Sequence, residues 1–134
     1  MVMSKTKHQK MFLAGTWVGR PQTIEVRNPQ DDSLISTVPA ATKEDALYAV
    51  EQAKEGADII ARMPVHERMA VLNRAADWID EHRETYARTI ALEGSKTIRE
   101  ARKEVARCIE TIRISAEEAR RIHGETIPFD QMPG

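Results

Sequence analysis

The strongest constraint on the fold is one long pattern near the C-terminal end of the sequence. Between Glu93 and Gly124, apolar or small residues recur at every third or fourth position: Ile98, Ala101, Val105, Cys108, Ile112, Ala116, Ala119 and Ile122. This spacing places them on one stripe of an α-helix and leaves charged residues on the other faces. Gly124 can adopt the left-handed conformation of a helix C-terminal cap, so the helix is expected to end there.

Two β-hairpins are predicted in the N-terminal part of the chain. Residues 1–10 are polar and are expected to form a disordered tail. Two short apolar runs in residues 11–19 are separated by Ala14-Gly15, which suits the positive φ of a tight hairpin turn. Residues 23–38 begin with period-two alternation and continue through a turn cluster at Asn28-Pro29 to a second apolar run. This segment is therefore expected to form the second hairpin.

Three further helices are predicted between the hairpins and the long helix. Thr42 and Asp45 have the spacing of a capping box, which marks the start of the first helix. Pro64 suits the first turn of the second helix, and Gly94-Ser95 interrupts the pattern after the third. The first of these helices carries a face of small and apolar residues suited to close packing: Ala46, Leu47, Ala49, Val50, Ala53, Ala57 and Ile60.

The predicted fold class is α+β and helix-dominated, with two N-terminal hairpins followed by four helices. Residues 11–134 are expected to form one incomplete domain, because the hairpins expose strand edges that need a partner.

Composition excludes several classes of partner. The 20 basic and 21 acidic residues give a net charge of −1, which provides no field for nucleic acid or anionic membrane. The single cysteine cannot form an internal disulfide, and no apolar run approaches the roughly 18 residues of a membrane span. Because the N-terminal segment also lacks the apolar core of a signal peptide, a cytoplasmic location is expected.

Few residues are candidates for chemistry. The glycines form no phosphate-binding motif. Cys108 lies on the predicted apolar stripe, where a free cysteine behaves as a small hydrophobic residue rather than a nucleophile. His82 and His123 are expected to interact with the C-terminal ends of helices. Glu93 precedes the break at Gly94 and is a candidate to share a cation with loop carbonyls, although a solvated or capping carboxylate remains the alternative.

The order and spacing of six segments in residues 11–128 resemble the N-terminal region of the NAD(P)-dependent aldehyde dehydrogenase superfamily. The segments are Phe12-Leu-Ala-Gly-Thr-Trp-Val, Ile24-Glu-Val-Arg-Asn-Pro, Thr42-Lys-Glu-Asp, Glu93-Gly-Ser-Lys, Glu100-Ala-Arg-Lys-Glu-Val and Gly124-Glu-Thr-Ile-Pro. The stretch that begins at Glu93 is most similar to the branch that acts on lactaldehyde, phosphonoacetaldehyde or glyceraldehyde 3-phosphate. The resemblance therefore implies a small and often anionic aldehyde substrate.

The resemblance also implies a reaction and a fold. In the family, a cysteine attacks the aldehyde, hydride passes to NAD or NADP, and water activated by a glutamate hydrolyses the thioester. An asparagine and a backbone N–H stabilise the oxyanion. All these groups and the cofactor loop lie beyond the part of the family that matches residues 11–128, and Cys108 does not match the nucleophile. This chain is therefore expected to have no catalytic or cofactor-binding residues and to be inactive alone. The full-length enzyme is expected to have the α/β aldehyde dehydrogenase fold and to be a homo-oligomer.

One site is implied by the resemblance within this chain. Some family members hold a structural cation with backbone oxygens just before Asn-Pro and an acidic side chain before Gly-Lys, which here are Val26, Arg27 and Glu93. This sequence has Glu93-Gly-Ser-Lys-Thr where the family usually has acid-x-Gly-Lys-Pro. The alternative function from a different class is a non-catalytic helical module for interaction or assembly.

Overall fold

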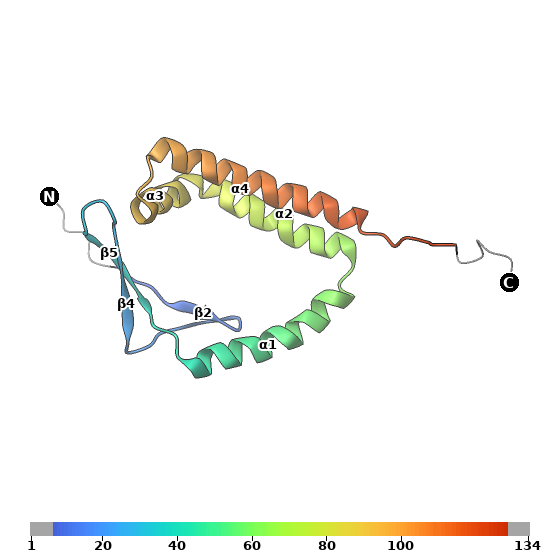
Figure 1. Cartoon of the computed structure of the whole chain (residues 1–134), viewed down its shortest axis with the longest axis horizontal. Helices are drawn as coiled ribbons and strands as arrows, with labels where there is room; N and C mark the ends of the chain where they lie inside the picture. The colour runs from blue at the N-terminus through green and yellow to red at the C-terminus, as the bar shows by residue number, and fades with distance from the viewer. Residues whose placement is uncertain (1–6, 129–134) are drawn as a thin grey trace.

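The computed structural model describes residues 7–128, in which four helices follow two small β-sheets (Figure 1). This confirms the helix-dominated α+β class and the order of hairpins and helices. In chain order the elements are β1 (Lys7–His8), β2 (Met11–Leu13), β3 (Thr16–Val18), β4 (Thr23–Arg27), β5 (Leu34–Pro39), α1 (Lys43–Arg62), α2 (Val65–Glu81), α3 (Arg83–Gly94), α4 (Ile98–Glu118) and the 3₁₀ turn η1 (Ala119–Arg121). In the described part of the chain, no helix is both long and apolar enough to cross a lipid bilayer.

The first hairpin forms where the sequence predicts it. Strands β2 and β3 pair antiparallel, and the turn between them has positive φ at Ala14 (46°) and Gly15 (84°). The rings of Phe12 and Trp17 lie on paired positions with their centroids 5.2 Å apart. This aromatic contact supports the hairpin, although both side chains remain largely exposed.

The second hairpin also forms, but it gains a third strand that was not predicted. Strands β4 and β5 pair antiparallel, and β1 pairs parallel to the other edge of β5. The N–H of Gln9 donates to the carbonyl of Thr37 at 2.9 Å, and His8 Nδ1 lies 2.6 Å from Thr37 Oγ1. The prediction of a disordered tail is therefore wrong for residues 7–10, because the free edge of β5 offers unpaired backbone groups. Residues 1–6 lie outside the described range.

Helix α1 begins at a capping box that is tied to Arg20 in the connection between the two hairpins. The N–H of Asp45 donates to Thr42 Oγ1 at 3.2 Å, and the N–H of Thr42 donates to Asp45 Oδ2 at 2.9 Å. Arg20 also donates to the same carboxylate, with Nε 3.0 Å from Oδ2. The hydrogen bonds from Arg20, followed by those from Thr42, lower the pKa of the Asp45 carboxyl from 3.8 to about 2. Asp45 therefore fixes the direction in which α1 leaves the sheet.

Acid titration should separate the wild-type chain from Asp45→Asn. A carboxyl whose pKa is depressed in the folded state stabilises the fold above its unfolded pKa of 3.8, and this contribution disappears as the pH falls toward 2. We expect Asp45→Asn to unfold at a lower urea concentration near neutral pH, and the gap between the two proteins to narrow over that acid range. Asp58→Asn, at an exposed position of the same helix, is the matched control. A gap that stays constant with pH would contradict this role.

Helices α2, α3 and α4 share the hydrophobic core. In Figure 1, α2 and α4 lie side by side along most of their lengths, and the short α3 joins them at one end. Three alanines, Ala76 of α2, Ala87 of α3 and Ala101 of α4, are completely buried, and small side chains let the helix backbones approach closely. Val105 and Ile109 complete the buried cluster, with Ile79, Ile90, Ala91 and Ile112 packed against it.

The buried face of α4 differs from the predicted stripe at Ile98, which is 39% exposed, and at Cys108. Cys108 is exposed, whereas Ile109 is 3% exposed and belongs to the core, so the prediction of a buried Cys108 is wrong. Both positions satisfy a spacing of three or four from Val105 and Ile112. Contact with α2 and α3 selects the isoleucine, because burying its larger apolar side chain removes more surface from water.

The long helix also ends earlier than Gly124. Helix α4 stops at Glu118, and the N–H of Ala119 donates to the carbonyls of Ser115 and Glu117 as the chain tightens into η1. Ile122 is then extended, with φ −72° and ψ 108°. The 3₁₀ turn provides hydrogen-bond donors for carbonyls in the last turn of α4, a role that the sequence assigned to a left-handed cap at Gly124. The predicted cap at Gly124 is therefore wrong.

Candidate functional site

The most distinctive segment of the sequence, Glu93 to Arg99, forms the connection between α3 and α4. Helix α3 ends at Gly94, and Ser95 adopts the left-handed conformation with φ 52° and ψ 36°. The ammonium of Lys96 then pairs with the carboxylate of Glu104 on the second turn of α4. Glu93 itself is exposed on the last turn of α3. The predicted helix break is confirmed, with serine rather than glycine in the left-handed position.

Helix α4 begins with a capping box that was not predicted. The N–H of Glu100 donates to Thr97 Oγ1 at 3.3 Å, and the N–H of Thr97 donates to Glu100 Oε2 at 3.2 Å. The Thr97 hydroxyl also donates to Glu100 at 2.7 Å, and these hydrogen bonds lower the pKa of the Glu100 carboxyl. The sequence signal for this capping box is a threonine followed three residues later by an acidic residue, which is the same spacing that marks the start of α1.

The other residues of the predicted cation site lie at the end of strand β4. The pairing of β4 with β5 shifts register between Val26 and Arg27, so the regular ladder of backbone hydrogen bonds is interrupted there. The Arg27 guanidinium donates to Glu25 Oε2 at 2.7 and 2.9 Å and to the Asp32 carbonyl at 2.8 Å. The charge of this side chain is therefore held by its own hairpin.

These two segments lie at the same end of the molecule. Figure 1 shows α3 and the sheet that contains β4 at the end of the molecule opposite the last turn of α4. Within residues 7–128, no three His, Cys, Asp or Glu side chains gather closely enough to hold a metal ion. A site that uses backbone oxygens of Val26 and Arg27 with one carboxylate from Glu93 is of a different kind, so it stays a prediction.

His82 interacts with the C-terminal end of α2, as predicted. Its Nδ1 donates to the carbonyl of Trp78 at 2.8 Å, and its ring stacks on the Trp78 ring with centroids 4.1 Å apart. His123 follows η1, and its Nδ1 donates to the carbonyl of Arg121 at 2.6 Å. Both imidazoles therefore have structural partners. Neither lies within a cluster of metal-ligating side chains in the described residues.

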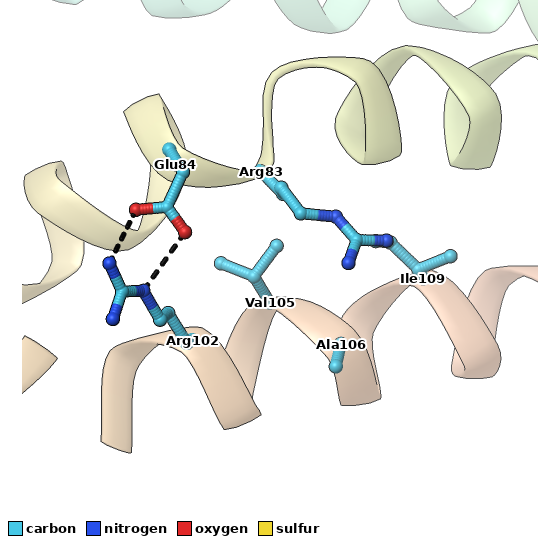
Figure 2. Close-up of a pocket in the computed structure, with 6 residues that line it drawn as sticks. All are labelled: Arg83, Glu84, Arg102, Val105, Ala106 and Ile109. Atoms are coloured by element: carbon cyan, nitrogen blue, oxygen red, sulfur yellow. Dashed lines mark hydrogen bonds and ion pairs between the residues drawn. The ribbon is translucent and has the colours of Figure 1, made fainter. Parts of the chain in front are cut away.

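A small hollow lies between α3 and α4, and Figure 2 shows the residues that line it. Its volume is about 100 Å³. Glu84 and Arg102 face each other across it, with Nε and Nη2 each 2.9 Å from a carboxylate oxygen. Small-molecule sites usually occupy roughly 300–1,000 Å³. This hollow is therefore too small for a dinucleotide, and the guanidinium of Arg102 is already engaged by Glu84.

Comparison with known proteins identifies the family. The model of the aldehyde dehydrogenase family matches residues 17–133. Aspartate-semialdehyde dehydrogenase 1 of Pseudomonas canavaninivorans is 40% identical over 83% of this chain and 24% of the relative. The 3-sulfolactaldehyde dehydrogenase of Priestia megaterium is 36% identical over 98% of this chain and 27% of the relative. Lactaldehyde dehydrogenase of Methanocaldococcus jannaschii is 32% identical over 90% of this chain and 26% of the relative.

Solved structures match over the same share of length. Aldehyde dehydrogenase 21 from Physcomitrella patens, in complex with the reaction product succinate, superposes with a TM-score of 0.92 at 35% identity over 96% of this chain and 27% of that structure. The NADP-dependent glyceraldehyde-3-phosphate dehydrogenase from Bacillus halodurans, complexed with NADP, superposes with a TM-score of 0.90 at 31% identity. This match covers 96% of this chain and 28% of that structure. The chain thus spans about a quarter of the length of its relatives. The chain belongs to the aldehyde dehydrogenase family, and it corresponds to an N-terminal portion of that fold.

Proposed function

We propose that this chain is the N-terminal part of an NAD(P)-dependent aldehyde dehydrogenase that oxidises a small, anionic aldehyde to the acid. The observation that carries the proposal is the alignment of nearly the whole chain with a quarter of 3-sulfolactaldehyde dehydrogenase. The named substrate of that relative carries a sulfonate, and those of two other similar proteins carry a carboxylate and a phosphate. Lactaldehyde, the substrate named for a further relative, is neutral and of the same size class.

The same proposal assigns the chemistry to a part of the enzyme outside these 134 residues. Oxidation of an aldehyde needs a nucleophile, a base, an oxyanion site and a bound nicotinamide within reach of one carbon atom. The only thiol is that of Cys108, which lies exposed on α4, outside the small hollow between α3 and α4. NAD or NADP supplies the hydride acceptor in the full-length enzyme. The helices of this chain contribute outer packing around the cofactor domain, and this chain alone is inactive.

Organisation and location belong to the same proposal. Residues 11–134 form the incomplete N-terminal part of the cofactor-binding domain, and the full-length enzyme is a cytoplasmic homo-oligomer. The balanced charge supports an aldehyde rather than a nucleic acid or an anionic membrane as the partner.

A matched pair of substrates tests the proposed preference. Lactaldehyde and 3-sulfolactaldehyde share the reacting group and differ by the sulfonate, so their kcat/KM ratio in the full-length enzyme measures recognition of the anion. We expect a ratio of at least about tenfold in favour of the sulfonate, because one charge-assisted contact is worth roughly 1.5–3 kcal/mol. Equal rates, or a preference for lactaldehyde, would exclude an anion-selective enzyme while leaving the oxidation of aldehydes intact.

We also propose that Val26, Arg27 and Glu93 hold a structural cation. The irregular backbone between Val26 and Arg27 is suited to offer carbonyl oxygens, and Glu93 offers an exposed carboxylate, which are the ligand types that hard cations prefer. Neutralisation of the Arg27 guanidinium by Glu25 and Asp32 lessens its repulsion of an incoming cation.

Cation-dependent stability tests this site. A cation that binds only the folded protein raises the melting temperature as its concentration increases. We expect the wild-type chain to show this rise with Na⁺, K⁺, Mg²⁺ or Ca²⁺, and Glu93→Gln to abolish it. Glu117→Gln, which removes an exposed carboxylate from α4, should respond like the wild type. If the melting temperatures of Glu93→Gln and Glu117→Gln rise equally with cation concentration, Glu93 is not a ligand of the cation.

The helical module remains the second candidate, because α2, α3 and α4 form a core of their own. Lack of turnover by the full-length protein would favour this module, whereas turnover by the full-length protein would favour a part of a larger enzyme.

A further inference from the structure

We draw no further inference here: the strongest candidate, the open hollow at the start of α4 to which Lys96, Lys103 and Arg107 contribute basic side chains, restates the recognition of anionic aldehydes that is an established property of this branch of the family.

Discussion

Val105→Asp should unfold the α2–α4 core. Val105 is 3% exposed and belongs to the cluster of fully buried side chains between these helices. Burial of a carboxylate without a partner there should cost on the order of 3 kcal/mol or more. Four of the six buried hydrophobic residues in the described chain are alanines, so little other apolar surface offsets this loss. We expect loss of the cooperative urea transition, or a large fall in its midpoint, measured by circular dichroism.

Cys108→Asp is the matched control, because it places the same charge three positions further along α4. Cys108 is exposed, so this variant should unfold within about 0.5 kcal/mol of the wild type. The pair also distinguishes the observed face of α4 from the stripe predicted from the sequence, on which both residues are buried. Equal destabilisation by the two substitutions would show that α4 is rotated relative to the structure described above.

The sequence predicts the local structure of this chain well where the signal lies in a few neighbouring residues. The turn at Ala14-Gly15 and the capping box of Thr42 and Asp45 both form as predicted, because backbone conformation and short-range hydrogen bonds decide them. The capping box at Thr97 has the same signature in the sequence, and it could have been predicted by the same rule.

The errors concern choices that depend on distant segments. Strand β1 forms because the edge of β5 is free, and residues 7–8 alone carry too little pattern to indicate this. Cys108 and Ile109 both satisfy helical spacing, so only the contact of α4 with α2 and α3 selects between them. Sequence periodicity therefore fixes that a helix is amphipathic but leaves its rotation uncertain by about one residue, or about 100°.

The candidate site depends even more on context. Glu93 was a candidate from its position before Gly94, whereas Val26 and Arg27 were assigned through the family resemblance, since backbone carbonyl ligands have no signature in residue type. The structure adds the irregular register at Val26 and Arg27 and the left-handed Ser95, both of which arise from backbone geometry. The face of small and apolar residues on α1 was predicted to suit close packing, whereas Leu47, Val50 and Ile60 of this face are exposed in the structure.

The second large effect is the expected absence of catalysis by this chain. In the proposed reaction a thiol attacks the aldehyde, and hydride then passes to a bound nicotinamide held in one geometry. The exposed thiol of Cys108 and a hollow of about 100 Å³ provide neither. The full-length enzyme should therefore turn over with rates typical of enzymes, on the order of 1–1,000 per second, whereas this chain should not exceed the rate of buffer alone.

The most direct test of this account is the rate of NADH or NADPH formation by the purified 134-residue chain with 3-sulfolactaldehyde or lactaldehyde. The full-length enzyme at equal molar concentration is the positive control, and the Cys108→Ser chain shows whether any residual signal involves the only thiol. We predict turnover by the full-length enzyme and none above background by the chain. Turnover by the chain that increases in proportion to its concentration would contradict the account.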